Sequence, residues 1–164
     1  MRFEYQDILD FLYSESRALD DKQWDQWLQH YAVDAEFWMP SWDDSGELVT
    51  NPQREVSLMY YRRRDGLEDR VFRIKTERSS ASSLPEPRTS HNLSNIEIVE
   101  EQGDTCQVRY NWCTHSIRYQ TVDSYFGTTF VTLRRDASGG LQITRKKVVL
   151  KNDYIHHVID VYHV

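Results

Sequence analysis

The sequence predicts an α+β fold, in which helices pack on one face of a curved antiparallel sheet that closes into a cone. In the first half of the chain apolar residues recur at three- and four-residue spacings, whereas after residue 95 they alternate with polar residues. Short turns separate the later strands, and short turns join antiparallel neighbours. The mouth of such a cone can accept a small molecule, and one face of the sheet stays free for another subunit.

The first third of the chain supplies two helices. An amphipathic stripe predicts a helix over residues 5–19, ahead of the capping side chains of Asp20 and Asp21. The same spacing predicts a second, shorter helix over residues 24–31. An extended run, Ala35–Trp42, follows and ends in a polar loop.

A third helix is expected after Asn51–Pro52, because asparagine caps helices and proline favours their first position. Its apolar side comprises Val56, Met59 and Tyr60. Gly66 is expected to end this helix, and the apolar spacing over residues 67–74 predicts one more helical piece. The composition of Ser79–Pro87 predicts a loop.

Strands dominate the second half. The expected strands are Asn95–Glu100, Cys106–Trp112, Ser124–Arg134 and Leu141–Leu150. Turns are expected at Gln102–Asp104 and Asp136–Gly140. Aromatic and β-branched residues over 154–162 favour a further strand. With no internal repeat and a length typical of one domain, residues 1–164 are expected to form a single domain.

Charge and hydropathy restrict the partners. The chain has 26 acidic and 20 basic side chains and a net charge of −6, which argues against nucleic-acid binding. The basic clusters Arg62–Arg64 and Arg145–Lys147 are short, as expected for solvated faces or salt-bridge partners. There is no apolar run of about 18 residues and no signal-peptide pattern, so no membrane segment and a cytoplasmic location are expected.

The two cysteines are expected to be reduced. Cys106 and Cys113 lie seven residues apart in one predicted strand, on opposite faces and about 23 Å from each other. Cys113-Thr114-His115 has the Cys-x-His spacing of half a Rieske iron–sulfur site. The other half needs a later cysteine, and none follows Cys113. A Rieske cluster within this one chain is therefore excluded, and a weak two-ligand site remains the alternative to two ordinary strand residues.

The histidines give no clear iron site either. His156 and His157 would face opposite ways on a strand, and His157 could meet Asp160 only on a helix. An Asp–His dyad inside the cone remains open, with His91 or His115 and an acidic partner such as Asp123. No phosphate-binding glycine loop and no Gly-x-Ser-x-Gly nucleophile motif is present.

Six blocks, in order, resemble the β (small) subunit of bacterial aromatic-ring-hydroxylating dioxygenases. They are Leu19–Trp27, Ala35–Pro40, Leu67–Ile74, Pro87–Asn95, Ser124–Gly127 and Val148–Tyr154. The segment Arg145–His157 is most similar to the benzoate/toluate 1,2-dioxygenase branch, with anthranilate and halobenzoate enzymes nearby. The blocks span essentially the whole chain, and their order and spacing are more specific than any one of them.

This resemblance implies a fold like nuclear transport factor 2 and scytalone dehydratase (NTF2-like, cystatin-like). It implies a non-catalytic structural subunit in an α3β3 hexamer, whose large (α) subunit carries a Rieske [2Fe-2S] cluster and a mononuclear non-heme iron. A separate reductase would deliver electrons from NADH for the cis-dihydroxylation of an aromatic carboxylate. The resemblance assigns no catalytic, cofactor-binding or metal-binding residue to this chain.

Residues that contact the large subunit are expected in the matching blocks. The candidates are Trp42, Arg88, Asn92, Lys147, Asn152 and Tyr154, which include the aromatic and basic types common at interface centres. Two other functions stay open from the residues alone. A stand-alone cone-fold isomerase or dehydratase would need a polar dyad in its pocket, and a ligand-binding protein would bind a small molecule without turnover.

Overall fold

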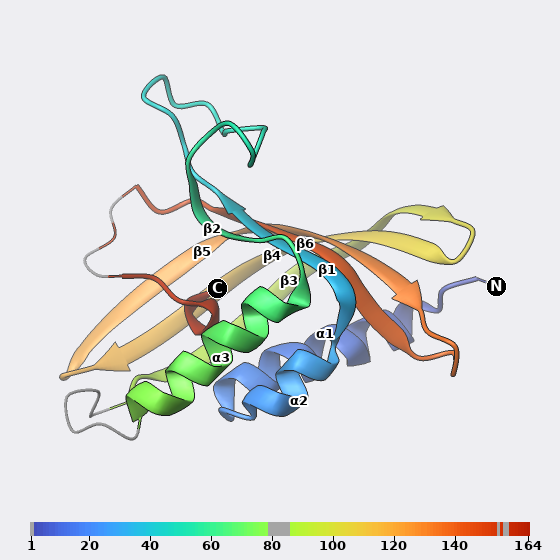
Figure 1. The fold of residues 1–164 in the computed structure, drawn as a ribbon, viewed down its shortest axis with the longest axis horizontal. Helices are drawn as coiled ribbons and strands as arrows, with labels where there is room; N and C mark the ends of the chain where they lie inside the picture. The colour runs from blue at the N-terminus through green and yellow to red at the C-terminus, as the bar shows by residue number, and fades with distance from the viewer. Residues whose placement is uncertain (1, 79–85, 154, 156–157) are drawn as a thin grey trace.

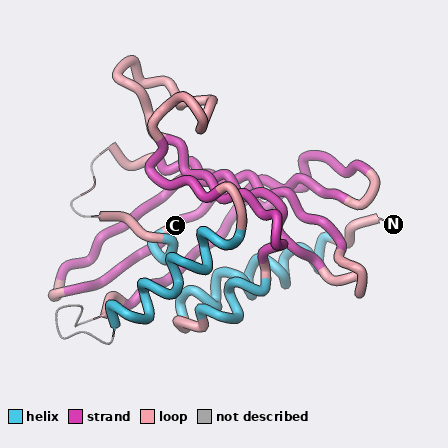
Figure 2. The backbone as a smooth tube through the Cα atoms, in the orientation of Figure 1, coloured by secondary structure: helices cyan, strands magenta, loops and turns pink. Residues whose placement is uncertain are grey.

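The computed structural model describes residues 2–78, 86–153, 155 and 158–164. In this part of the chain one twisted six-stranded sheet has helices packed against a single face (Figures 1 and 2). The predicted α+β class is confirmed. Within the described residues no helix combines the length and the apolar character that crossing a bilayer requires.

The sheet has the strand order β2-β1-β6-β5-β4-β3. Its strands are β1 (Tyr31–Pro40), β2 (Ser57–Tyr61), β3 (Arg88–Gln102), β4 (Thr105–Arg118), β5 (Thr121–Arg135) and β6 (Leu141–Leu150). Strands β3 to β6 form an antiparallel meander, as predicted. The sheet differs from a purely antiparallel one at β1, which pairs parallel with β6. A parallel pair needs a long connection, and here β2 to β5 lie between the two strands in the chain.

In the described part of the chain, three α-helices and a 3-10 helix accompany the sheet. They are α1 (Tyr5–Asp20), α2 (Trp24–Gln29), α3 (Arg64–Arg78) and η2 (Val161–His163). The stripe that predicted α1 is confirmed, because Ile8, Leu12 and Leu19 are buried against the sheet. The second helix ends two residues earlier than predicted, and Tyr31 already belongs to β1.

The helix predicted after Asn51–Pro52 is wrong. Residues 51–55 form turns, in which Asn51 Oδ1 accepts a hydrogen bond from the main-chain nitrogen of Gln53. Residues 57–61 form β2, which pairs with β1 and places Tyr60 opposite Trp38. Pairing with the edge of the sheet outweighed the local helix signals. Val56 is 77% exposed, so it is not part of a buried helix face.

Gly66 does not end a helix but lies in the first turn of α3. A Cβ atom there would lie 2.6 Å from Cδ1 of Tyr61, so glycine allows the start of α3 to pack against the end of β2. The strand predicted over 154–162 is also wrong in its described part, where Val161–His163 is a 3-10 helix capped by Asp160. Tyr154, His156 and His157 lie outside the described residues.

Candidate functional site: the cone interior and the outer sheet face

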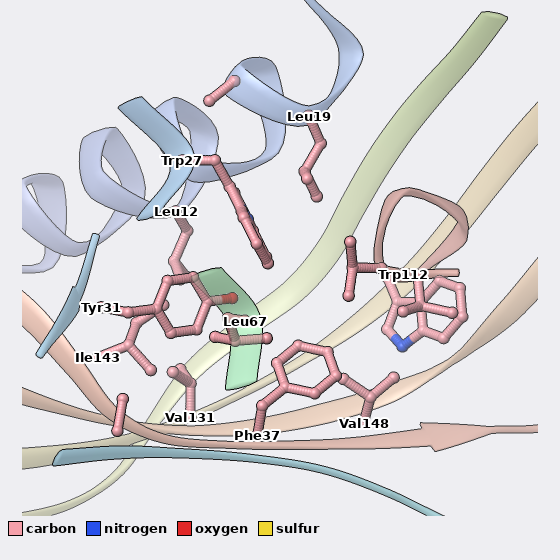
Figure 3. Packing of buried hydrophobic residues seen from close by; sticks show 14 of the residues in the cluster. Leu12, Leu19, Trp27, Tyr31, Phe37, Leu67, Trp112, Val131, Ile143 and Val148 are labelled. Carbon is pink, nitrogen blue, oxygen red and sulfur yellow. The ribbon is translucent and has the colours of Figure 1, made fainter. Parts of the chain in front are cut away.

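The interior of the cone is filled with side chains. Figure 3 shows Trp27 from α2 and Leu67 from α3 in one buried cluster with Tyr31 and Phe37 from β1 and Trp112 from β4. All five are at least 96% buried. Trp27 and Tyr31 pack edge to face, with ring centroids 5.0 Å apart. These side chains fill the space between the helices and the inner face of the sheet.

A charged pair lies within this packing. Glu15 on α1 and Lys146 on β6 are 2% and 3% exposed, and Lys146 Nζ lies 2.8 Å from Glu15 Oε1. Trp27 Nε1 and the Tyr31 hydroxyl donate hydrogen bonds to the same oxygen, at 2.9 and 2.8 Å. Burial raises the pKa of a carboxyl, but the charge of Lys146 and the hydrogen bonds from Lys146, Trp27 and Tyr31 together outweigh it, and the pKa of Glu15 falls to about 2. Both groups are therefore charged at neutral pH.

A bulge in β6 determines which of its side chains face the interior. Ile143 and Lys146 both face the interior although they are three positions apart, because the register shifts between β5 and β6 near Thr132. Beyond the shift, Lys147 faces the opposite side of the sheet, where its Nζ lies 5.1 Å from the ring centroid of Trp38. Two adjacent lysines thus lie on opposite faces.

An Asp–His pair is present, but with a different acid from the one expected. Asp20, at the end of α1, lies 2.5 Å from His91 Nδ1 and accepts hydrogen bonds from the His91 main-chain nitrogen and the Thr89 hydroxyl. His91 Nε2 lies 3.2 Å from the main-chain oxygen of Val164. Neither His91 nor His115 pairs with Asp123, so that proposed dyad is wrong. Both ring nitrogens of His91 have partners within the fold, and the cluster fastens α1, β3 and the last described segment together.

Cys113 and His115 share the outer face of β4, as their spacing predicted. Cys113 Sγ lies 3.8 Å from His115 Nε2, and His115 Nδ1 lies 2.8 Å from the Ser124 hydroxyl. Cys106 is buried on the opposite face, and both thiols are free. In the described part of the chain no group of three or more His, Cys, Asp or Glu side chains is placed to hold a metal. These residues do not fit a Rieske cluster or a three-ligand iron site.

A cavity of about 850 Å³ lies at the mouth of the cone, lined among others by Arg70, Arg118, Asp123 and Tyr162. Arg70 Nε donates a hydrogen bond to Asp160 Oδ1 at 2.9 Å, and Asp160 is 96% buried. Beside it, η2 inserts Val161 and His163 into the core. The last described segment therefore covers part of the mouth.

The outer face of the sheet carries no helix in the described part of the chain (Figure 1). Exposed aromatic and basic side chains lie at its centre. We define the outer-face patch as Arg109, Phe126, Phe130, Lys147 and Lys151. Phe126 and Phe130 are 49% and 42% exposed. The guanidinium carbon of Arg109 lies 5.6 Å from the Phe130 centroid, and Lys147 Nζ lies 6.0 Å from it. An uncovered sheet face with exposed rings is typical of an interaction surface.

A pocket of about 370 Å³ opens at one end of this patch. Phe126 and Lys151 line it together with Asn92, Asn111 and Cys113. The Asn111 side-chain oxygen accepts a hydrogen bond from the Thr128 hydroxyl at 3.0 Å. The side-chain nitrogen of Asn111, which is a hydrogen-bond donor, therefore points away from Thr128. The pocket therefore combines an exposed ring with hydrogen-bond donors and a lysine.

Most of the predicted interface residues lie on or beside this face. Arg88, Asn92 and Lys147 have outward positions in their strands. Trp42 Nε1 donates a hydrogen bond to the main-chain oxygen of Leu150 at 2.7 Å. Asn152 Oδ1 accepts one from the Phe126 main-chain nitrogen at 3.0 Å, which ties the segment after β6 to β5. Tyr154 lies outside the described residues. Three of the other five thus lie on the outer face and two beside the end of β6, and their role at an interface stays a prediction.

Sequence reasoning missed Arg109, Phe126, Phe130 and Lys151. A signal was present in β5, where Tyr125 and Val131 face the core while Phe126 and Phe130 face outward. A strand that is apolar on both faces indicates a sheet whose second face also becomes covered. The alternation alone identified the strand but did not show which of its two faces would be exposed.

The chain matches the family of ring hydroxylating beta subunits over residues 14–157. It is 59% identical to the toluate 1,2-dioxygenase subunit beta of Pseudomonas putida, with all of both chains covered. It superimposes on the crystal structure of the beta subunit of benzoate 1,2-dioxygenase from Burkholderia mallei with a TM-score of 0.86, at 52% identity, covering 100% of this chain and 99% of the other.

The fold extends beyond these relatives. A candidate scytalone dehydratase from Novosphingobium aromaticivorans matches with a TM-score of 0.65 at 15% identity, covering 93% of this chain and 89% of the other. This likeness shows the cone-shaped α+β fold alone and confirms the predicted fold class. The closer matches define the family: the chain belongs to the beta subunits of ring-hydroxylating dioxygenases.

Proposed function

We propose that this chain, acting as a single domain over residues 1–164, is the structural small subunit of a benzoate- or toluate-type 1,2-dioxygenase. The observation that carries the proposal is its 59% identity, over its full length, to a toluate 1,2-dioxygenase subunit beta. The packed cone interior and the uncovered outer sheet face support a subunit that binds a partner protein. The stand-alone enzyme is not favoured, since the relatives that match the chain over its whole length are dioxygenase beta subunits.

The partner in this proposal is a large oxygenase subunit, in an assembly of three large and three small subunits. The large subunit carries the Rieske cluster and the mononuclear iron, and a reductase supplies electrons from NADH in the cytoplasm. This chain holds the large subunits together and takes no part in the chemical step. The substrate class is an aromatic carboxylate, which the complex cis-dihydroxylates with molecular oxygen.

Co-expression tests this function. A tagged copy of the chain is expected to recover the large subunit from cells grown on benzoate, and the complex plus reductase and NADH is expected to consume benzoate. Elemental analysis should find iron in the complex and none in stoichiometric amount in the isolated chain. Failure to recover a large subunit, or one bound iron per isolated chain, would overturn the proposal.

A further inference from the structure

The outer-face patch differs in charge from the rest of the chain. The protein carries a net charge of −6, yet the patch contains Arg109, Lys147 and Lys151 around two exposed phenylalanines. A nearby carboxylate is already paired, because Glu36 Oε1 lies 3.0 Å from Arg145 Nε. Glu97 is the register partner of Arg109 on the neighbouring strand β3. Among the described residues neither Lys147 nor Lys151 forms an ion pair.

Lys147 is held where an anion would improve its environment. It is half-buried between the rings of Trp38 and Phe130. Burial and the neighbouring charge of Arg145 lower the pKa of Lys147. A carboxylate from a partner would offset both effects, because an opposite charge nearby favours the charged form of a lysine. A partner with acidic groups therefore complements this side chain.

The pocket next to Phe126 can receive one such group. Lys151 and Asn111 line it with donors, and the Phe126 ring, 49% exposed, forms an apolar wall. A second copy packed across a twofold axis would bring equivalent lysines together, since such contacts use the same patch on both subunits. A contact around the threefold axis of the proposed assembly would join different patches, and the self-association of the free chain tests for it. Like charges placed against each other at an interface cost binding energy.

We propose that the outer-face patch binds an acidic, partly apolar segment of the large subunit. A carboxylate of that segment occupies the pocket beside Lys151, and an apolar side chain covers Phe126 and Phe130. This inference rests on the proposed function, because it takes the large subunit as the partner. It adds the surface on this chain and the chemistry that the partner must present.

A paired charge reversal tests it. The Lys147→Glu/Lys151→Glu variant is compared with wild type and with Arg73→Glu, an exposed change on α3 at the opposite side of the sheet. Affinity for the large subunit is measured at low and high salt, and the fold of each free chain is checked by its denaturation midpoint. The patch variant is expected to bind at least about tenfold more weakly and to lose most of the salt dependence. Arg73→Glu is expected to bind within about twofold of wild type.

The outcomes distinguish a failure of the proposed function from a failure of the proposed binding surface. If the wild-type chain forms no complex, the proposed function itself fails. If the wild-type complex forms and the patch variant binds equally well, the function stands and this surface assignment is overturned. A loss of self-association of the free chain in the patch variant would mean that a second copy occupies the patch, which also overturns it.

Discussion

Lys146 and Lys147 are neighbours on β6, yet they lie in opposite environments. Lys146 faces the cone interior, 3% exposed, with Glu15 as its partner. Lys147 faces the outside of the sheet, between Trp38 and Phe130. One strand thus serves two purposes. Its inner face contributes to the stability of the chain, and we propose that its outer face contributes to assembly.

The largest expected effect separates these two lysines. Lys146→Met leaves Glu15 buried without its cation, and breaking a buried ion pair costs about 3–5 kcal/mol of unfolding free energy. Lys147→Met, the matched control, is expected to cost at most about 1 kcal/mol, since it loses partly exposed cation–π contacts. Urea denaturation of both free chains measures the difference. Equal losses would remove the contrast between the two faces.

The pH dependence of stability provides a second test of the interior. The folded pKa of Glu15 is about 2, below the value of about 4.3 for an unfolded glutamate. Its contribution is therefore complete above about pH 4.3 and is lost as pH falls toward 2, by about 3 kcal/mol in total. The stability advantage of wild type over Glu15→Gln should shrink by that amount between pH 5 and 2. An advantage that stays constant with pH would show that the charge of Glu15 does not stabilise the fold.

The Asp20–His91 contact should have an intermediate effect. Asp20→Asn weakens three contacts that join α1 to β3, and removing a hydrogen-bonded charged group typically costs about 1–3 kcal/mol. Asp34→Asn is the control, because Asp34 forms an exposed ion pair with Arg134, worth about 0.2–1 kcal/mol. Thermal unfolding of the two variants should rank them in this order, and the reverse order would contradict the role of Asp20 in joining α1 to β3.

The smallest effect on stability is expected on the outer face. Phe130→Ser in the free chain should lower the unfolding free energy by no more than about 1 kcal/mol, because the ring is 42% exposed and its cation–π contacts are partly solvated. A loss of several kcal/mol would mean that this ring contributes to the core of the isolated chain. The same chemical denaturation is measured on Val131→Ala, a change at a buried residue that is expected to cost more than about 1 kcal/mol of unfolding free energy. The loss in Phe130→Ser should be the smaller of the two.

The sequence predicted the helical and strand halves because their hydrophobic periods differ clearly. It misplaced β2, since Asn51–Pro52 and a few apolar residues imitate a helix start, and only the edge of β1 supplies the pairing that makes Ser57–Tyr61 a strand. The parallel pairing of β1 with β6 joins segments about 100 residues apart, which no local pattern encodes.

The candidate site was predictable in part. Lys147 and Asn92 were predicted as interface residues from the segments that resemble dioxygenase small subunits. The structure places both on the outer face. The pair of Glu15 with Lys146 could not be predicted, because the bulge near Thr132 decides that Lys146 points inward. Without that bulge the alternation would send Arg145 and Lys147 into the interior instead. A single extra residue in a strand thus determines both the buried pair and the exposed patch.

One variant can test whether the outer face of the sheet serves assembly while the inner face stabilises the chain. Phe126→Ser/Phe130→Ser, co-expressed with the large subunit, is compared with wild type by native mass spectrometry and by urea denaturation of the free chain. We expect wild type in a complex with equal numbers of large and small subunits, and the variant as a free chain with nearly unchanged stability. A variant that remains in the complex would contradict an assembly role for the outer face, and a variant that unfolds would show that both faces stabilise the chain.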